Sequence, residues 1–227
     1  MNLKQQVKET YEREARIYDK TRAIFEKGRF AYKERKLLSE FLERNSLILF
    51  LACGTGRHFN FLVNQLGSEV VGVDISINML RIAKKKQNVY LIAADVENLP
   101  FRQNTFDALV CSRAFYLFDN KLRVLQEAHT VLKRGKKLIV STIFKDLLLT
   151  RLGIRMGVLE HDPLQHPYTS KQLVEMFRKT HFKNIQRKCI VSFTGNPLHI
   201  PSQFLRMMNL IENRLHGGRW AMAIGEK

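Results

Sequence analysis

The sequence predicts an α/β fold: a three-layer sandwich in which helices cover both faces of a seven-stranded, mostly parallel sheet. Two observations support this prediction. Apolar runs of strand length alternate with helical stretches between residues 47 and 142, and such alternation is typical of a parallel sheet. The first run is followed by the turn Gly54-Thr55-Gly56, and open α/β sheets bind ligands where such strands end.

The elements of the sheet follow from the hydrophobic pattern. Residues 47–52 are continuously apolar, as expected for a strand that is covered on both faces. The alternation of elements then continues to residue 142. We expect further strands at 70–74, 89–94, 106–111 and 137–142, and helices at 57–65, 77–86 and 121–132.

The two ends of the chain complete the predicted sandwich. Residues 4–45 have the pattern of two helices with i,i+4 charge pairs such as Glu9–Arg13, and Gly28 breaks or bends the second. Near the other end, Thr169 and Ser170 can cap a helix. There we expect helices at 171–181 and 201–216, and strands at 184–194 and 219–225.

Composition limits the classes of protein to consider. The chain has 227 residues, of which 45% are hydrophobic, as in an ordinary globular protein of one domain. Its apolar runs are too short to span a bilayer, and its first residues lack a signal-peptide pattern, so we expect a cytoplasmic protein. Three widely spaced cysteines predict neither a disulfide framework nor a metal site.

The charge is strongly basic and unevenly distributed. The formal net charge is +17, and the last 95 residues hold 17 Lys and Arg against 6 Asp and Glu. A basic C-terminal half could attract an anionic surface, either a membrane or RNA, or an acidic small molecule. A solvated surface without any partner explains the same composition, so both interpretations stay open.

The glycine turn has the chemistry of a ligand-binding loop. Gly54 and Gly56 allow backbone conformations with positive φ and a close approach of a ligand, and the N–H groups of a following helix favour anions. The third glycine of a dinucleotide fingerprint is replaced by Phe59. A nicotinamide or flavin cofactor is therefore disfavoured, and the sequence holds no P-loop pattern either.

Two carboxylates follow the next two strands. Asp74 lies 20 residues beyond Gly54, where a carboxylate can accept hydrogen bonds from ribose hydroxyls. An alternative role for Asp74, together with Ser76, is to supply the N-terminal charge and cap of the next helix. Asp95 follows the third strand and can accept a hydrogen bond from an exocyclic amine.

In this order, the motifs resemble those of a known family. The chain resembles the class I S-adenosylmethionine-dependent methyltransferases, and within them the type 11 group of ubiquinone and menaquinone biosynthesis methyltransferases. The resemblance covers about residues 10–143 and implies the Rossmann-like methyltransferase fold. Members of this family end in an antiparallel C-terminal hairpin, which the strands expected at 184–194 and 219–225 would form. It is strongest in the turn at 52–56 and in the segments 71–80, 95–101, 104–107 and 127–135.

The resemblance implies a cofactor, S-adenosyl-L-methionine, and a division of one domain. Residues 1–45 would form a helical lid, 46–143 the cofactor-binding core, and 144–227 the substrate cap and the last strands. Arg113 would lie near the methyl donor together with Ser112. The implied cofactor-binding residues are Tyr18 of the lid, Ala52, Gly54 and Gly56 of the loop, Asp74 at the ribose, Ile75, Met79, Asp95 and Val96 at the adenine, and Ser112.

Two positions depart from the family pattern. Phe50 stands where the family usually has an acidic residue, and Ala52 stands where it usually has glycine. The first change removes a carboxylate that helps to order the loop, and the second adds a methyl group close to the cofactor. We expect either weaker cofactor binding or a protein that binds the cofactor without using it.

The predicted reaction is methyl transfer to a small-molecule acceptor, quinone-like or related to lipids. Methyl transfer depends mainly on alignment, and a base is needed only for a protonated acceptor, so no catalytic residue is assigned. The alternatives are an RNA methyltransferase, for which neither an RNA-binding module nor an Asn-Pro-Pro-aromatic motif is found, and a non-catalytic cofactor-binding protein. Candidate bases or pocket residues are His58, His129, His161, Asp162, His166, Tyr18 and Tyr116.

Overall fold

The computed structural model describes residues 2–21, 29–143, 168–191 and 220–227. The possible break at Gly28, the predicted helix at 201–216 and more than half of the region predicted as the cap and the last strands (144–227) lie outside these residues. Among the described residues, no helix is both long enough and apolar enough to cross a membrane. The predicted cytoplasmic location and the division into lid, core and cap stay predictions.

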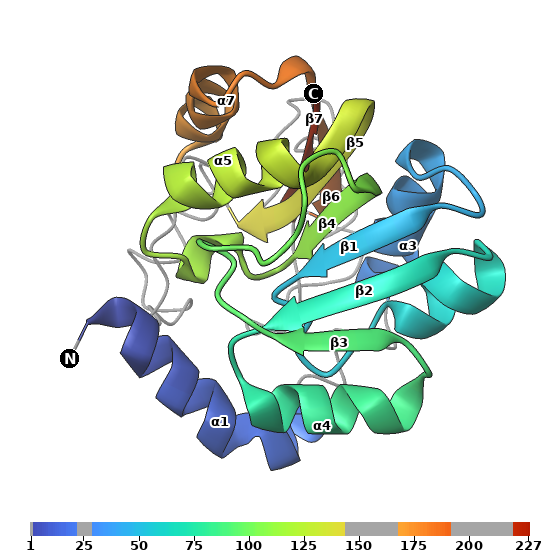
Figure 1. The fold of residues 1–227 in the computed structure, drawn as a ribbon, viewed down its shortest axis with the longest axis vertical. Helices are drawn as coiled ribbons and strands as arrows, with labels where there is room; N and C mark the ends of the chain where they lie inside the picture. The colour runs from blue at the N-terminus through green and yellow to red at the C-terminus, as the bar shows by residue number, and fades with distance from the viewer. Residues whose placement is uncertain (1, 22–28, 144–167, 192–219) are drawn as a thin grey trace, which may run out of the picture.

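The described strands form one seven-stranded sheet in the order β3-β2-β1-β4-β5-β7-β6. The first five strands pair in parallel, and β7 lies antiparallel between β5 and β6. This arrangement confirms the predicted fold class and the C-terminal antiparallel hairpin (Figure 1). The strands are β1 (Leu47–Leu51), β2 (Glu69–Asp74), β3 (Tyr90–Ala93), β4 (Phe106–Ser112), β5 (Leu132–Ile143), β6 (Lys183–Val191) and β7 (Trp220–Glu226).

Helices cover both faces of this sheet. One apolar cluster joins the strands to α5 and α7, and a second joins them to α3, η1 and α4. Alternate residues of a strand point to opposite faces, so Leu49 and Leu51 belong to the first cluster and Ile48 and Phe50 to the second. The helices are α1 (Leu3–Thr21), α3 (Arg29–Phe41), η1 (Phe61–Gln65), α4 (Ile77–Lys86), η2 (Phe115–Leu117), α5 (Lys121–Val131) and α7 (Ser170–Lys179).

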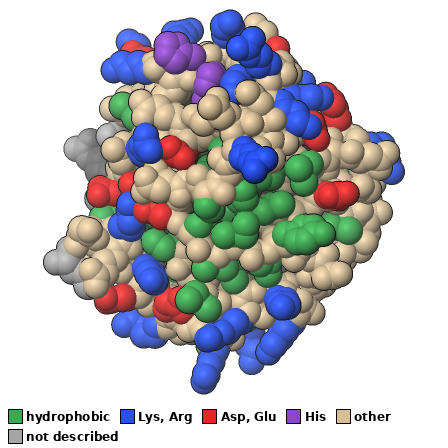
Figure 2. All heavy atoms as spheres, viewed as in Figure 1, with side chains coloured by type: hydrophobic (Ala, Val, Ile, Leu, Met, Phe, Trp, Pro, Cys, Tyr) green, Lys and Arg blue, Asp and Glu red, His purple; other side chains and the backbone are tan. Residues whose placement is uncertain are grey.

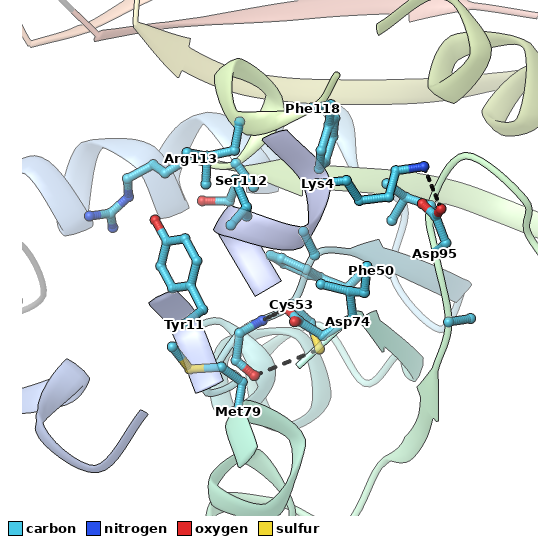
Figure 3. Close-up of a pocket in the computed structure, with 18 of the residues that line it drawn as sticks. Lys4, Tyr11, Phe50, Cys53, Asp74, Met79, Asp95, Ser112, Arg113 and Phe118 are labelled. Carbon is cyan, nitrogen blue, oxygen red and sulfur yellow. Dashed lines mark hydrogen bonds and ion pairs between the residues drawn. The ribbon is translucent and has the colours of Figure 1, made fainter. Parts of the chain in front are cut away.

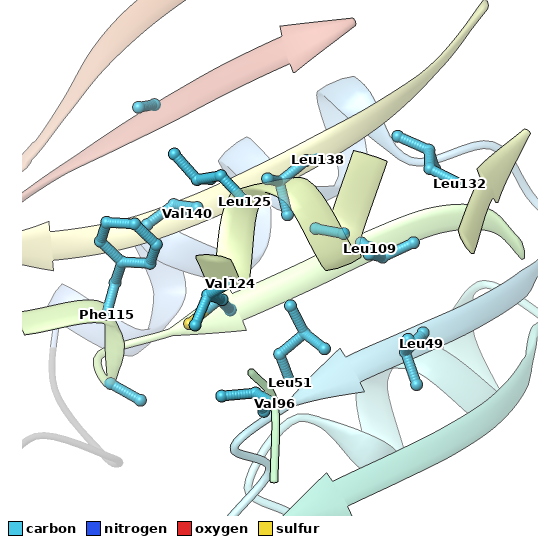
Figure 4. Packing of buried hydrophobic residues seen from close by; sticks show 14 of the residues in the cluster. Leu49, Leu51, Val96, Leu109, Phe115, Val124, Leu125, Leu132, Leu138 and Val140 are labelled. Carbon is cyan, nitrogen blue, oxygen red and sulfur yellow. The ribbon is translucent and has the colours of Figure 1, made fainter. Parts of the chain in front are cut away.

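The first cluster holds the central strands and α5 together. Figure 4 shows Leu109 and Leu138 of neighbouring strands packing beside Val124 and Leu125 of α5. Each of these side chains is at most 1% exposed, and burying one such side chain contributes roughly 1.5–3 kcal/mol. This packing fixes the carboxyl ends of β1 and β4, where the predicted site lies.

The same face of the sheet is less completely covered over β2 and β3. The register places Leu49, Val71 and Tyr90 side by side on this face. Val71 is half-buried and Tyr90 is 71% exposed. Figure 2 shows hydrophobic side chains gathered at the centre of this face of the molecule, with Lys and Arg around them.

Element boundaries differ from the predictions in two places. The helix predicted at 57–65 is shorter and becomes a π-helix over Phe61–Gln65, because the turn that contains Gly56 extends to His58. The fifth strand begins at Leu132, directly after α5, with a register shift between Phe106 and Ala108 of its neighbour. The remaining predicted boundaries within the described residues agree to within about three residues.

Candidate functional site

A pocket opens where β1, β2 and β4 end, and α1 lies across it. Carboxyl ends of parallel strands meet at one edge of a sheet, so loops far apart in the sequence come together there. Figure 3 shows Asp74 and Cys53 in the middle, Asp95 and Lys4 at one end, and Ser112 and Arg113 at the other. The structure therefore brings most of the predicted site residues to one place.

Nine of the ten predicted cofactor-binding residues line this pocket, and Gly56 does not. Gly56 has φ +72°, and a Cβ atom there would lie 2.5 Å from the ring of Phe59. The absence of a side chain at Gly56 therefore allows Phe59 to pack under the loop. The lining residues are Tyr18, Ala52, Gly54, Asp74, Ile75, Met79, Asp95, Val96 and Ser112; their roles in binding, like that of Gly56, stay predictions.

Asp74 ties the glycine loop to the end of β2. Its Oδ2 accepts a hydrogen bond from the Gly54 N–H at 2.7 Å, and its Oδ1 accepts one from the Ser76 N–H at 2.9 Å. Burial raises the pKa of Asp74 to about 6, although these backbone hydrogen bonds oppose the shift. A carboxylate has about four acceptor positions, so Asp74 can still accept ribose hydroxyls.

The contacts at the N-terminus of α4 show which of two roles Asp74 has: binding at the glycine loop, or supplying charge at the start of the helix. Ser76 is the N-cap, and its Oγ accepts the Met79 N–H at 3.2 Å. The negative charge at this helix end comes from Glu12 of α1, which accepts the N–H groups of Ile77 at 2.7 Å and Asn78 at 3.2 Å. Asp74 is thus directed to the glycine loop, while Glu12 occupies the helix end.

Ala52 has a backbone conformation that suits glycine. Its φ is +47°, in the left-handed region, where a residue with a Cβ atom is strained by roughly 1–3 kcal/mol. Gly54, two residues later, has φ +55° and open space where a Cβ would stand. Such strain persists only where surrounding structure holds it, and here the Cys53 N–H bonds to the Val73 carbonyl at 2.9 Å.

The wall of the pocket at Asp95 holds a cluster of carboxylates that Lys4 of α1 contacts. Asp95 Oδ1 accepts the Glu97 N–H at 2.9 Å, and Lys4 Nζ donates to Asp95 Oδ2 and Glu97 Oε2, both at 2.7 Å. Burial alone would lower the pKa of Lys4, but these bonds outweigh it and raise that pKa. The carboxylate predicted to meet the adenine amine is therefore in contact with α1.

Helix α1 covers the pocket with one face. Lys4, Val7, Tyr11 and Tyr18 all line it, and a spacing of three, four and seven residues places them on the same side of a helix. Near its C-terminal end, Asp19 accepts a hydrogen bond from Thr55 Oγ1 at 2.6 Å. The predicted lid segment thus lies where a lid would act.

A buried polar network lies beside Phe50, the position at which the family resemblance would place an acidic residue. The Phe50 ring is 2% exposed and stacks on His58 with ring centroids 5.8 Å apart. Behind it lies Glu34 of α3, whose Oε1 accepts the Ser112 hydroxyl at 2.7 Å and whose Oε2 accepts Arg113 Nη2 at 3.0 Å. His58 Nε2 lies 3.1 Å from Ser112 Oγ.

Sequence reasoning missed Glu34, although a signal was present. Ala31, Leu38 and Leu42 are buried and mark the apolar side of this segment, and Glu34 falls on the same side by its spacing. A charged residue among buried positions is rarely left without a partner. That pattern could have indicated a buried ion pair, but not the identity of the partner.

Of the candidate bases and pocket residues within the described part of the chain, Tyr18 lines the pocket, and His58, His129 and Tyr116 do not. Among the described histidines none lines it: His58 lies behind Ser112, and burial lowers its pKa. His129 packs against Phe182 on α5, and Tyr116 belongs to the apolar core. His161, Asp162 and His166 lie outside the described residues. No described group of His, Cys, Asp and Glu is arranged to hold a metal ion.

Comparisons with known proteins agree with this geometry. Residues 49–140 match the family described as a methyltransferase domain. The UbiE ubiquinone/menaquinone biosynthesis C-methyltransferase of Wigglesworthia glossinidia brevipalpis is 37% identical over 110 residues, 44% of each chain. The demethylmenaquinone methyltransferase of Thermotoga maritima is 34% identical over 133 residues, 57% of this chain and 58% of that protein. These matches span about half the length of the curated relatives.

A solved structure extends the likeness to nearly the whole chain. It is a SAM-dependent methyltransferase of Thermotoga maritima, described as a possible histamine N-methyltransferase, with a TM-score of 0.71 and 21% identity. The match covers 96% of this chain and 98% of that one. At this identity the likeness concerns the fold.

Fold and site together define a class I, Rossmann-like methyltransferase architecture. Residues 49–140 match the methyltransferase-domain family, and the relatives that the chain resembles include a ubiquinone/menaquinone biosynthesis C-methyltransferase and a demethylmenaquinone methyltransferase. These likenesses agree with the predicted class of protein.

Proposed function

We propose that the chain transfers a methyl group from S-adenosylmethionine to a small-molecule acceptor that is quinone-like or related to lipids. The observation that carries this proposal is the pocket at the ends of β1, β2 and β4, where Asp74 and the Gly54 N–H meet. Ligands of open α/β sheets bind at this place.

The residues present fit such a cofactor. Gly54 leaves open space beside Asp74, so a ribose can approach a buried carboxylate. The half-buried Ile75 and the buried Met79 supply an apolar wall, which suits an adenine ring. The pocket continues past the end of β4 to Ser112 and Arg113, which leaves room for the amino-acid end of the molecule.

In the reaction, the protein aligns the reactants and excludes water. The bound cofactor supplies a methyl group on a positively charged sulfur. Tyr11 and Tyr18 of α1 cover the pocket, and closing a site in this way holds the reactants together, which can contribute on the order of 7 kcal/mol or more. Tyr18, one of the candidate bases, lines the pocket, and no described histidine does.

The type of acceptor is inferred from two sources. Val7, Leu117 and Phe118 give the pocket an apolar part next to Arg113, and this favours a ring or chain with little charge. By their names, one of the relatives described above is a ubiquinone/menaquinone biosynthesis C-methyltransferase and the other is a demethylmenaquinone methyltransferase. The anionic partner suggested for the C-terminal half is a separate expectation, because most of that half lies outside the described residues.

Titration calorimetry with S-adenosylmethionine tests the proposal. We expect binding by the wild-type chain and an affinity at least about tenfold weaker in Asp74→Ala, equal to about 1.4 kcal/mol. Glu43→Ala, which removes an exposed carboxylate that is paired with Lys136, is the matched control and should bind normally. No binding by the wild-type chain would refute the proposal.

Turnover is tested separately. We expect methylated product when the chain is incubated with S-adenosylmethionine and a reduced demethylmenaquinone analogue. Binding of S-adenosylmethionine without turnover of any quinol or lipid-related acceptor would favour the non-catalytic alternative. Methylation of RNA in place of the quinol would favour the RNA methyltransferase alternative, and salt-dependent RNA binding would accompany it.

A further inference from the structure

Helix α1 places a charged side chain on the segment that follows each of three neighbouring strands. Asp19 accepts the Thr55 hydroxyl in the loop after β1 at 2.6 Å. Lys4 donates to Asp95 in the loop after β3 at 2.7 Å. Glu12, between them, accepts two N–H groups at the start of α4, which follows β2. Positions 4, 12 and 19 are each separated by about two helical turns, so the three side chains lie along one side of α1.

Apolar packing contributes little to the docking of α1 on these segments. Of its 19 residues only Ala15 is buried, and Val7 and Tyr11 are only partly buried against the core. The ion pairs of α1 are open to water, since the side chains of Lys4 and Asp19 are 32% and 35% exposed. Exposed pairs are screened by salt. The docking of α1 therefore depends largely on polar contacts that water and salt weaken.

Glu12 makes the contact that completes a helix end. An α-helix begins with N–H groups that have no partner within the helix. The N-cap Ser76 accepts one of them, the Met79 N–H. Glu12 accepts two, those of Ile77 at 2.7 Å and Asn78 at 3.2 Å, and α4 has no acidic residue in its own first turn. Removal of Glu12 would leave two N–H groups and the positive end of the helix dipole without the partner that they have here.

The start of α4 is also one wall of the pocket. Ile75, directly before α4, and Met79 in its first turn line the pocket where an adenine ring would pack, whereas Glu12 does not line it. Figure 3 shows Lys4 directed at Asp95 in a different part of the pocket from Met79. Helix α1 thus contacts both parts that would hold the adenine: the apolar wall through Glu12 and the carboxylate through Lys4.

We propose that Glu12 is a positioning residue of the cofactor site, which fastens α1 to the start of α4 and so holds Ile75 and Met79 in place for the adenine. Lys4 fastens the same helix to Asp95. This inference rests on the proposed function and adds to it a residue that does not itself contact the cofactor. Docking of α1 and binding of the cofactor then favour each other, and the apparent affinity falls with the fraction of molecules in which α1 is docked.

Variants of α1 in the full chain test the positioning role. The probe is S-adenosylhomocysteine, the cofactor without its transferable methyl group, at pH 8, where Asp74 is ionised. We expect Glu12→Ala to weaken binding of this probe at least about threefold, because α1 is then docked in a smaller fraction of molecules. Lys4→Gln should weaken it less, by about twofold, since the side chain of Lys4 is a third exposed in its ion pairs.

Two exposed residues of the same helix provide matched controls. Glu9→Gln removes a carboxylate whose hydrogen bond, from Gln5, stays within α1. Lys8→Gln removes an exposed ammonium group one turn after Lys4. Each control changes the charge of α1 by the same amount as the variant that it matches. Both should bind the probe as the wild-type chain does, which excludes the net charge of α1 as the cause of a loss.

Ionic strength shows whether the contact acts through charge. S-adenosylhomocysteine has no net charge near pH 8, so salt acts on its binding mainly through the protein. The Debye length falls from roughly 10 Å at 0.1 M salt to roughly 3 Å at 1 M. Over this range we expect the wild-type affinity to fall about twofold or more, and the double variant Lys4→Gln/Glu12→Ala should lose most of this dependence.

Hydrogen exchange tests the coupling in the wild-type chain. A coupling between two binding events is reciprocal, so bound S-adenosylhomocysteine should slow the exchange of the backbone amides of α1. The same measurement in Glu12→Ala should show less slowing, because α1 has lost its contact with α4.

The outcomes separate this inference from the proposed function. A wild-type chain that does not bind the probe refutes the proposed function itself. Normal binding by Glu12→Ala, or exchange in α1 that the probe leaves unchanged, overturns the positioning role while the proposed function stands. A lower free energy of unfolding in Glu12→Ala with normal affinity would give Glu12 a purely structural role. If Glu12→Ala does not fold, Glu12→Gln, which keeps one acceptor oxygen, and hydrogen exchange in the wild-type chain still decide.

Discussion

The two ends of the pocket hold the same kind of ion pair in different surroundings. At one end Lys4 and Asp95 lie 2.7 Å apart, with side chains 32% and 27% exposed. At the other end Arg113 and Glu34 lie 3.0 Å apart, with side chains 6% and 0% exposed. The distances are similar, so the difference between the two ends is burial.

Burial changes what each pair contributes. Water screens an exposed pair and its net contribution is small, about 0–1 kcal/mol. A buried pair contributes little as a pair, but removal of one partner leaves a charge without compensation and costs about 3–5 kcal/mol. The exposed pair is therefore expected to break at little cost, whereas the buried pair is not.

Glu34→Ala should have the largest effect. We expect a loss of about 3–5 kcal/mol in the free energy of unfolding, because Arg113 would stay buried without its counterion. Urea unfolding at pH 7 measures it, with Glu43→Ala as the exposed control, which should cost less than about 1 kcal/mol. Equal losses in the two variants would remove the distinction between buried and exposed pairs.

Asp74 lies between the two ends, and its raised pKa of about 6 predicts pH-dependent binding. Only the ionised carboxylate accepts two ribose hydroxyls well, so affinity for S-adenosylhomocysteine should weaken as pH falls through about 6. Asp74→Asn should bind about tenfold more weakly at pH 8 and lose this pH dependence. Binding titrations between pH 5.5 and 8 test this prediction. The same dependence of affinity on pH in the wild-type chain and in Asp74→Asn would contradict it.

The raised pKa of Asp74 also affects the free energy of unfolding, and this dependence on pH is opposite to that of cofactor binding. The folded pKa of Asp74 lies above its ordinary value of 3.8, so the folded state binds this proton more tightly than the unfolded state. The contribution of Asp74 to stability is therefore present below pH 3.8 and is lost as pH rises toward about 6. In Asp74→Asn that part of the pH dependence of unfolding should disappear.

Ala52→Gly tests the strained loop between the ends. Glycine adopts φ near +47° without strain, so we expect the free energy of unfolding to rise by about 1 kcal/mol. Thermal and urea unfolding measure this, and Gly54→Ala, which introduces a Cβ at φ +55°, should change stability in the opposite direction. A loss of stability in Ala52→Gly would mean that the contacts of the Ala52 methyl group stabilise the fold by more than the backbone strain costs.

Lys4→Gln should have the smallest effect on stability. The pair with Asp95 is a third exposed, so we expect a change below about 1 kcal/mol that shrinks further in high salt. Urea unfolding at low and high ionic strength measures the change. A loss of free energy of unfolding as large as that of Glu34→Ala would show that the contact between α1 and Asp95 contributes as much as a buried ion pair.

Much of the fold was predictable because parallel sheets leave a clear pattern. Strands covered on both faces are continuously apolar, and this pattern located β1, β2 and β4 within a residue or two. The π-helix at Phe61–Gln65 was not predicted, since its residues also fit an ordinary helix. The antiparallel hairpin of β6 and β7 was expected from the family resemblance and is confirmed.

The candidate site was predictable wherever its residues follow strand ends. Asp74, Asp95 and Ser112 were found in this way, and they line one pocket. Lys4, Glu12 and Glu34 were missed because each lies on a helix and meets its partner only through tertiary packing. An ordinary charged helix residue and a buried one have the same local sequence pattern.

By itself, the sequence determined the sheet, the loop after β1 and the class of protein, because these depend on local hydrophobic periodicity and on motifs in fixed order. The tertiary structure alone decided which charges are buried. It put Glu34 of α3 behind Arg113 and Lys4 of α1 onto Asp95. The physical reason is that the energy of a charge depends on its solvation and on its neighbours in space, and neither is encoded in residues adjacent along the chain.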